Sequence, residues 1–374
     1  MHLDIPKLSF VDSIAKELKT KELVIITGLP GSGKTELAHQ IVQALTNIIT
    51  TKEKLANFQH IHDLKNLDFV INEDKMIFLI LDHCIKSWFN KTVIDDMFKK
   101  LKSSTKKTKG MVHALVCVPD ILLEAFKSSL KSSSFKNVIY DLKDGNIYKD
   151  EDWKVIFDSH LKSKNEMMKS LKYQKTDIDA WRQSFIEIQA GDIGKPTLAK
   201  LLFEDARNFQ NVSNFLQNTH ECIMNRISAL SESTCVSERR HFVVLVMLML
   251  NNGKLNTDEL NKDALADICK SFDVEDVNLF EQLEYPEIGQ NAKMVTVHCR
   301  ETVRVTFDVL WKKRKDLVFK YCDDTVFLEL VSLTEGMTDQ ELIALNDRFQ
   351  SIFRSMKGKF HVEDHNVASK LLRK

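Results

Sequence analysis

A lysine, a threonine and two glycines near the start of the chain have the types and the spacing of a phosphate-binding loop. Gly28 is followed, after four residues, by Gly33, Lys34 and Thr35, which fits G-x-x-x-x-G-K-[ST] without a mismatch. Glycines let such a loop turn its backbone N–H groups toward a polyphosphate. Lys34 would reach the β- and γ-phosphates, and the Thr35 hydroxyl would bind Mg²⁺. The pattern predicts binding of a nucleoside phosphate. The residues predicted to contact it are Gly28, Leu29, Pro30, Gly31, Ser32, Gly33, Lys34, Thr35 and Glu36.

An aspartate at the end of an apolar run is a second candidate for chemistry. Residues 76–81 are apolar, MIFLIL, and Asp82 follows them directly. In phosphate-loop proteins, an aspartate at the end of a buried strand often holds Mg²⁺, directly or through water. The alternative is that Asp82 only caps the next segment. We favour Thr35 and Asp82 as the Mg²⁺ ligands, because the apolar run before Asp82 is uninterrupted.

These residues need a strand before the loop and a helix after it, and the surrounding pattern provides both. Residues 23–26 are apolar and predict a buried strand, and an apolar-periodic helix follows from Gly33 to about residue 50. Helical patterns then alternate with further strand-like runs. These runs are at 58–62, 76–82, 111–118 and 137–142. The alternation predicts an α/β fold with a parallel sheet covered on both faces.

The pattern changes at about residue 151, where strand-like runs stop and amphipathic helices follow. From about residue 274 it mixes again, with a strand predicted at 293–297, a helix at 301–312 and an extended piece at 325–333. The sequence therefore predicts an all-α region after the sheet and a mixed region after that. The predicted helices of the all-α region are at 177–189, 197–206, 210–217, 219–230, 239–251 and 257–271.

Composition limits the class of protein. The chain has 374 residues, with 53 Lys and Arg against 53 Asp and Glu, so its formal net charge is zero. No overall basic field draws it to nucleic acid or to a membrane, and neither is expected as a partner. The longest apolar run, 242–250, is too short to span a bilayer. Seven scattered cysteines indicate reduced thiols, and the N-terminus lacks the layout of a signal peptide. A cytoplasmic protein is expected.

Several segments, taken in order, carry a likeness to a known family. LVIITGLPGSGKTELA contains the phosphate loop, and MIFLILD ends in Asp82. Four further segments follow in the family's order, at 150–162, 193–205, 241–260 and 294–310. The chain thereby resembles the STAND class of phosphate-loop NTPases, relatives of the NACHT and NB-ARC modules. Within that class it is most similar to the group called novel STAND NTPase 3.

The resemblance implies a domain order and a mode of action. An α/β nucleotide-binding domain is expected at 1–145, helical domains at 146–271, a winged-helix-like domain at 272–357 and a polar basic tail at 358–374. The implied ligands are ATP and ADP with Mg²⁺. In such proteins ADP holds the domains closed, and exchange for ATP releases them. The release exposes surfaces for self-association or for a protein partner.

Two residues outside the loop match family positions that read the nucleotide. Pro196, in Gly194-Lys195-Pro196, resembles the proline that packs on the adenine; the alternative is an ordinary proline at a helix start. His298 resembles the winged-helix histidine that senses the β-phosphate of ADP. Its alternative is a partly buried imidazole with a structural role only.

Two departures from the family pattern bear on hydrolysis. Members usually carry a second acid after the Mg²⁺ aspartate to orient the attacking water, and this chain has His83 there. They also usually carry an arginine after the third strand, where this chain reads Val118-Pro119-Asp120. His83 is the candidate catalytic residue in place of the acid. The transition-state charge then lacks two stabilising groups, so binding is expected to be intact and hydrolysis weak.

The leading hypothesis is an ATP- and ADP-binding regulatory switch with slow ATPase activity at most. A degenerate scaffold that keeps its nucleotide as a structural element is one alternative. A small-molecule phosphotransferase is another, although residues 143–175 offer only lysines where an arginine-rich lid would be expected. A GTPase is disfavoured because no N-K-x-D motif is present.

Overall fold

The structure is a computed structural model in which two compact units follow one another along the chain. The N-terminal unit is Met1–Ala199 and the C-terminal unit is Lys200–Lys374. The boundary falls inside the region predicted to hold the helical domains, and the domain limits expected from the sequence stay predictions. The residues that the structure describes are 6–49, 56–61, 64, 67, 76–82, 84–107, 112–133, 135–143, 145, 147–170, 173–189, 191–275, 279–281, 283, 285–291, 293–332, 337–356, 365 and 367–368.

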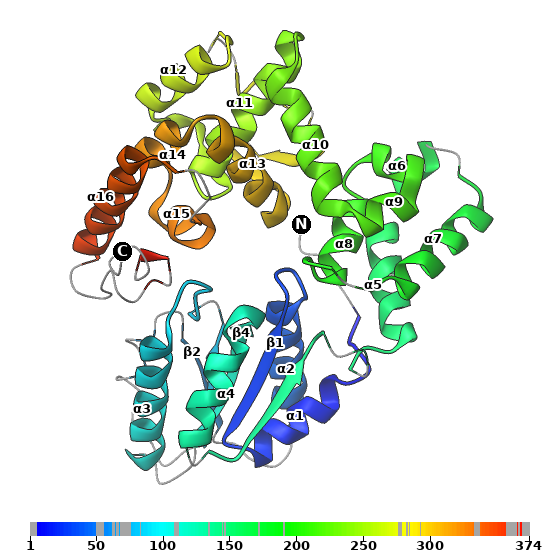
Figure 1. The fold of residues 1–374 in the computed structure, drawn as a ribbon. Coiled ribbons are helices and arrows are strands. Elements are labelled where there is room, and N and C mark those ends of the chain that lie inside the picture. Colours follow the sequence, from blue (N-terminus) through cyan, green and yellow to red (C-terminus); the bar gives the residue numbers. More distant parts are fainter. Residues whose placement is uncertain are drawn as a thin grey trace. The chain divides into compact units, whose positions relative to one another are not determined.

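A five-stranded parallel sheet forms the centre of the N-terminal unit, as the sequence predicts (Figure 1). Its strands lie in the order β2-β3-β4-β1-β5. Their bounds are Leu23–Gly28 (β1), Ala56–His60 (β2), Met76–Leu81 (β3), Val112–Pro119 (β4) and Asn137–Asp141 (β5). All six residues of β1 are buried, because β1 is an interior strand with helices over both faces. The carboxyl ends of the strands therefore meet at one edge, where ligands of open α/β sheets bind.

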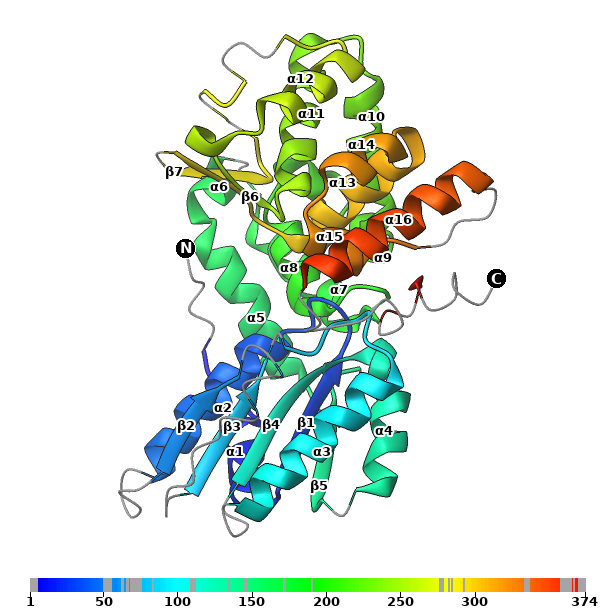
Figure 2. The ribbon, with the colours of Figure 1, turned by 90° about the vertical axis from the view of Figure 1, so that its left-hand side faces the viewer.

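Helices cover both faces of this sheet. Helix α1 packs against α2 on one face, and α3 packs against α4 on the other (Figures 1 and 2). The apolar side of α1, which includes Ile14 and Leu18, is buried. The helices around the sheet are Val11–Thr20 (α1), Lys34–Ile49 (α2), Lys91–Lys107 (α3) and Leu123–Ser132 (α4), with a 3₁₀ turn at Asp120–Leu122 (η2).

After the sheet, the described residues of the N-terminal unit form helices and their connections. The helices are Asp150–Ser163 (α5), Asn165–Ser170 (α6), Lys175–Glu187 (α7) and the start of Lys195–Leu202 (α8). Helix α5 packs against α7, and Phe157 and Phe185 are fully buried between them. A hydrogen-bonded contact ties the start of the chain to α5: Ser9 N–H and Ser9 Oγ–H donate to the two carboxylate oxygens of Asp152, at 2.7 and 2.8 Å. This contact joins residues 143 apart in sequence.

The C-terminal unit is mostly helical and contains a small antiparallel sheet. Helix α11 is its core, since every residue from His241 to Leu250 is buried. The sheet has the order β6-β8-β7, with bounds Lys254–Asn256 (β6), Ile288–Asn291 (β7) and Met294–Val297 (β8). The helices are Val212–Gln217 (α9), Thr219–Glu232 (α10), Val236–Leu250 (α11), Lys262–Ser271 (α12), Arg300–Lys313 (α13), Lys315–Tyr321 (α14), Asp324–Leu330 (α15) and Asp339–Ser355 (α16), with 3₁₀ turns at Ala206–Asn211 (η3) and Thr257–Glu259 (η4). The winged-helix arrangement expected for 272–357 stays a prediction.

The extended piece predicted at 325–333 is wrong, because most of that segment forms helix α15. Asp323 caps the helix, and its carboxylate accepts hydrogen bonds from Thr325 N–H and Val326 N–H at 2.8 and 3.2 Å. The apolar residues that suggested a strand bury one helical surface instead, including Val326 and Phe327. A local cap together with tertiary burial outweighs the β-branched composition here.

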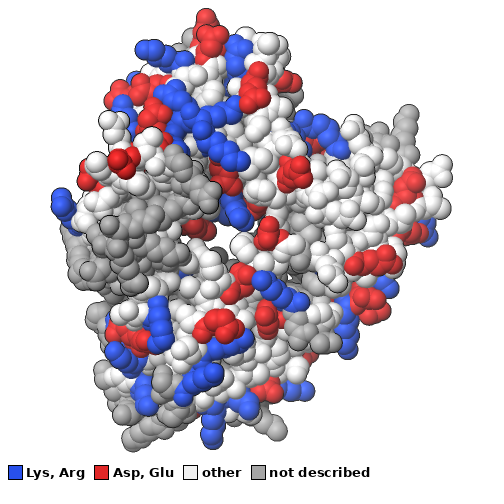
Figure 3. Space-filling model, in the orientation of Figure 1, with Lys and Arg blue, Asp and Glu red and all other residues white. Residues whose placement is uncertain are grey.

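The surface agrees with the charge balance of the sequence. On the face seen in Figure 3, basic and acidic side chains are intermixed on both units. Within the described residues, no helix is both long enough and apolar enough to cross a membrane. All seven cysteines belong to the described residues and are thiols, and five of them are buried.

Candidate nucleotide-binding site

The phosphate loop connects the buried strand β1 to helix α2, as the sequence predicts. Gly31 and Gly33 have φ angles of +72° and +83°, in the left-handed region that side chains rarely adopt. These two glycines let the loop reverse over a few residues before α2 begins at Lys34. The hydroxyl Oγ of Ser32 is buried and has no hydrogen-bond partner among the described residues. A buried donor inside a loop of this shape fits an anionic ligand that would accept its hydrogen bond.

Lys34 points back over the loop. Its ammonium donates to the carbonyl oxygens of Gly28 and Leu29 at 2.8 and 2.9 Å. Burial lowers the pKa of Lys34, while the neighbouring charges of Asp120 and Asp82 act in the opposite direction. Two neutral carbonyl oxygens therefore hold the lysine at the loop. A charged phosphate would be a stronger acceptor for its ammonium group.

The predicted Mg²⁺ ligands lie together. Asp82 follows β3 directly, and the Thr35 hydroxyl lies 3.3 Å from Asp82 Oδ1. Asp82 is buried, with 8% of its surface exposed. No set of three His, Cys, Asp or Glu side chains that would hold a metal alone occurs among the described residues. A hydroxyl and one carboxylate are nevertheless the usual protein share of a Mg²⁺ site in which phosphates and water provide the other ligands. The arrangement fits Mg²⁺ bound together with a nucleotide.

Cys117, on β4, is a neighbour of the site that the sequence did not identify. Burial raises the pKa of its thiol well above the ordinary value, and the nearby Asp82 carboxylate adds to the effect. Its Sγ also lies 3.7 Å from the carbonyl oxygen of Lys34. A neutral thiol in this place is a packing group that contacts both Asp82 and the first turn of α2.

An aromatic stack supports the other side of the loop. The Tyr148 hydroxyl donates to the carbonyl oxygen of Ser32 at 3.3 Å, and the Tyr148 ring stacks on Trp153 with centroids 4.1 Å apart. The ammonium of Lys195 lies 4.8 Å from the centre of the Trp153 ring and donates to Ile186 O at 2.7 Å. Burial lowers the pKa of Lys195. This cation–π contact fixes the start of α8 beside the stack.

The start of α8 is bonded directly to the phosphate loop, which the sequence did not predict. Gly194 N–H donates to Pro30 O at 2.9 Å, and Thr197 N–H contacts Gly31 O at 3.2 Å. The two segments are close enough to exclude side chains. A Cβ atom on Gly31 would meet Thr197 Cβ at 2.6 Å, and one on Gly194 would meet the Gly31 carbonyl carbon at 2.7 Å. We call this contact between residues 30–33 and 194–197 the loop–α8 interlock.

Pro196 lies at the phosphate loop. Its Cγ would be 3.5 Å from a Cβ atom on Gly33, so the ring faces the last glycine before Lys34. Pro196 is also the second residue of α8, as the structural alternative requires. The proposed packing on an adenine remains a prediction.

His298 belongs to the C-terminal unit, where it follows β8. Its N–H donates to Glu287 O at 2.9 Å, and its carbonyl accepts from the Lys200 ammonium. The proposed contact with the β-phosphate of ADP is a prediction that this unit alone does not test. His83 lies outside the described residues, so its proposed role also stays a prediction. Glu36 lies in the first turn of α2, where its Oε1 accepts a hydrogen bond from Gln40 Nε2 at 3.5 Å.

Comparison with known proteins agrees with the sequence resemblance. Residues 7–163 match the model of the family described as Novel STAND NTPase 3. The predicted resemblance is confirmed over these residues. The matched part contains the sheet, the phosphate loop and Asp82, so a nucleotide-binding NTPase domain of STAND type is supported. No curated protein matches the chain.

Solved structures give only remote similarity. The chain is similar to the Aeropyrum pernix ORC2 protein in ADPNP-ADP complexes, with 11% identity, a TM-score of 0.35, and coverage of 83% of this chain and 96% of that one. It is also similar to the Thermotoga maritima RuvB Holliday junction branch migration motor, with 14% identity, a TM-score of 0.35, and coverage of 80% and 97%. The C. elegans PCH-2 structure has 14% identity and a TM-score of 0.34, with coverage of 57% and 68%. TM-scores this low support no functional argument.

Proposed function

We propose that this chain is an ATP- and ADP-binding regulatory switch of the STAND type, in which the nucleotide controls domain opening and assembly. The observation that carries the proposal is the loop–α8 interlock. Phosphates bound by the loop act on the same backbone segment that holds Gly194 and Thr197. A nucleotide that changes the loop therefore changes the attachment of α8, and α8 leads into the second unit.

We also propose slow hydrolysis, from the residues at the end of β4. Bound Mg²⁺ would supply charge neutralisation to the phosphates. Thr35 and Asp82 would hold the metal, and Lys34 would bind the phosphates. Strand β4 ends at Pro119, and Asp120 begins the 3₁₀ turn η2, where the family usually has an arginine. An arginine that stabilises the transition state contributes ~10³–10⁵ in rate. We propose that ATP stays bound much longer than in a working ATPase.

Identification of the co-purified nucleotide tests the binding part of the proposal. The native protein, denatured and analysed by mass spectrometry, should release ATP or ADP in stoichiometric amount. Lys34→Ala should release none, since losing charge-assisted bonds to a phosphate lowers affinity on the order of a hundredfold or more. Stoichiometric nucleotide in Lys34→Ala would show that the phosphate-loop assignment is wrong.

Hydrogen exchange of residues 191–200 tests the switch. The native protein loaded with ADP and with ATPγS should differ in protection of this segment, because the two ligands bias the interlock differently. Equal protection in both states, with nucleotide retained, would support a structural nucleotide in a scaffold and overturn the switch.

A further inference from the structure

An ion pair spans the carboxyl end of β1, where the phosphate loop begins. In the sheet, β1 lies between β4 and β5. Gly28 pairs with Pro119 of β4, and a Cβ on Gly28 would lie 3.0 Å from Leu142 Cβ on the β5 side. Asp120 and Lys143 come directly after these two neighbours.

The side chains of these two residues meet. Lys143 Nζ lies 2.8 Å from Asp120 Oδ2. Because the strands on which they follow flank β1 on its two sides, the pair bridges from one side of the loop's first glycine to the other. Ligands of parallel α/β sheets bind at this edge, at the carboxyl ends of the strands. The ion pair is therefore placed at the entrance to the phosphate loop.

The charges of the pair bear on an anionic ligand in opposite ways. Asp120 and Asp82 both lie close enough to Lys34 to act on its charge. Two carboxylates beside a polyphosphate-binding site repel the ligand, and Mg²⁺ would compensate the charge of Asp82 only. Lys143 is 46% exposed and has a long side chain, so it can turn from Asp120 toward a phosphate without disturbing the core.

We propose that Lys143 is a second phosphate-binding cation, which leaves Asp120 for the terminal phosphate of a bound nucleoside triphosphate. The inference rests on the proposed nucleotide binding. Lys143, which follows β5, would provide the positive charge that an arginine after β4 usually provides in the family. Asp120 then competes with the phosphate for Lys143, so it sets how strongly the site prefers a triphosphate over a diphosphate.

The preference is measured as the ratio of ATPγS affinity to ADP affinity, with Mg²⁺, by titration calorimetry on the full chain freed of nucleotide. Lys143→Met should lower this ratio by about tenfold, as expected for the loss of one charge-assisted contact. Asp120→Asn should raise the ratio, because it removes the competitor. Lys143→Arg keeps the cation and should retain most of the ratio.

The matched control is Lys127→Met. Lys127 is 45% exposed and pairs with Glu124 at 2.8 Å on α4, so it resembles Lys143 in exposure and in the length of its ion pair. Its substitution should leave the ratio unchanged. If the ion pair only stabilises the ends of the strands, Lys143→Met and Asp120→Asn should change both affinities alike, with no change in the ratio.

Each outcome decides between the claims. Opposite changes of the ratio in Lys143→Met and Asp120→Asn support the inference. Equal or absent changes, with nucleotide still bound by the native chain, overturn the inference and leave the proposed function standing. Absence of ADP and ATPγS binding in the native chain overturns both. Should Lys143→Met fail to fold, Asp120→Asn alone decides, because an unchanged ratio there contradicts the competition.

Discussion

Replacing Gly31 by alanine tests the loop–α8 interlock most directly. Gly31 has φ +72°, and a left-handed backbone costs a residue with a side chain about 1–2 kcal/mol. The new methyl group would also meet Thr197 Cβ at 2.6 Å, so α8 has to move away. The movement breaks the two backbone hydrogen bonds of the interlock, worth about 1 kcal/mol each. We expect Gly31→Ala to destabilise the N-terminal unit by about 3–4 kcal/mol.

A second substitution separates the clash from the backbone strain. The three heavy atoms nearest to the new methyl group all belong to the Thr197 side chain. Thr197→Gly removes them, so the double variant should recover about 2 kcal/mol relative to the sum of the single effects. The strain at Gly31 should remain. Gly191→Ala is the control within the same segment, because a Cβ there meets nothing within 4 Å.

Urea unfolding followed by tryptophan fluorescence measures these free energies. A Trp311→Phe background leaves Trp88, Trp153 and Trp181, so the signal comes from the N-terminal unit alone. A cost below about 1 kcal/mol for Gly31→Ala, or additive effects of the two substitutions, would refute the interlock as a stabilising contact.

Three further predictions concern the contact of Pro196 and His298 with the nucleotide, the rate of ATP turnover and the pH dependence of stability. If Pro196 and His298 both reach the nucleotide, ADP should raise the melting temperature of the whole chain in one step; protection confined to residues 22–145 in hydrogen exchange would contradict this. Replacing His83 by Asp should raise ATP turnover while leaving nucleotide affinity within a few-fold, and turnover on the order of one per second by the native chain would contradict the slow-hydrolysis proposal. Burial raises the pKa of Glu287, but His241 and Arg226 outweigh burial and lower that pKa to about 2. A lowered folded-state pKa means stability that is present above the unfolded value of about 4.5 and is lost as pH falls toward 2, so Glu287→Gln should flatten the acid limb of the unfolding curve of the C-terminal unit.

The sequence predicted the parts of the site that depend on local pattern. The phosphate loop needs particular residue types at fixed spacing, and the apolar runs before Gly28 and Asp82 identify their strands. Parallel pairing then brings the strand ends to one edge, which places Thr35 beside Asp82. The strands and the helix that make these contacts are recognisable from the hydrophobic periodicity of the sequence.

Contacts between distant segments were not predictable in this way. Nothing in the types of Gly194 and Thr197 indicates that they meet residues 30 and 31, since the contact depends on how α5 and α7 position α8. The Asp120–Lys143 pair likewise depends on which strands flank β1. The prediction for 325–333 was wrong for a different reason. Its β-branched residues suggested an extended strand, but they are buried by a capped helix.

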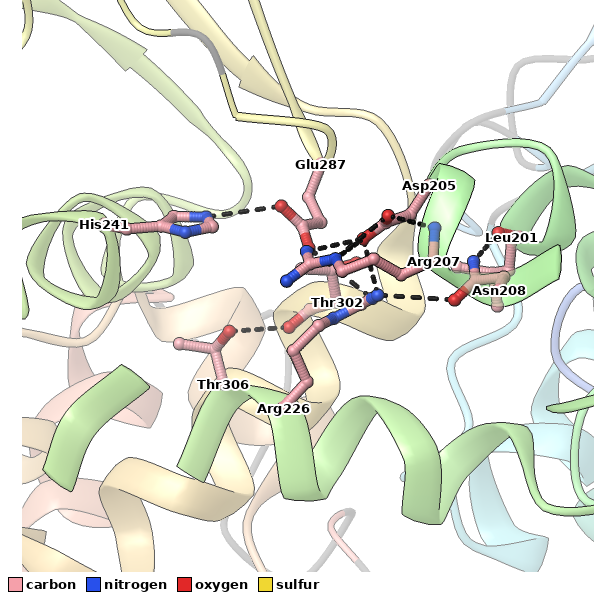
Figure 4. A network of polar contacts seen from close by, with 9 residues as sticks. All are labelled: Leu201, Asp205, Arg207, Asn208, Arg226, His241, Glu287, Thr302 and Thr306. Atoms are coloured by element: carbon pink, nitrogen blue, oxygen red, sulfur yellow. Dashed lines mark hydrogen bonds and ion pairs between the residues drawn. The ribbon is translucent and has the colours of Figure 1, made fainter. Parts of the chain in front are cut away.

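A network of buried charges in the C-terminal unit accounts for the lowered pKa of Glu287. Arg226 contacts Asp205 Oδ2 at 2.7 Å and Glu287 Oε1 at 3.4 Å, and His241 Nε2 lies 3.3 Å from Glu287 Oε2 (Figure 4). Arg207 also binds Asp205, at 2.6 Å. Asp205 and Glu287 are only 3% and 2% exposed, so these partners, rather than water, compensate their charges. The network joins η3, α10 and α11 to the segment before β7.

This balance of buried charges has a consequence for how the sequences of related chains can vary. Loss of one member leaves an opposite charge buried without compensation, which costs about 3–5 kcal/mol and is rarely tolerated alone. Substitutions at Asp205, Arg226 and Glu287 should therefore arise together in related chains, either as a retained set or as a joint change to apolar residues. Correlated variation among these three positions would extend recognition of relatives beyond the matched residues 7–163, into the unit that the family model does not cover.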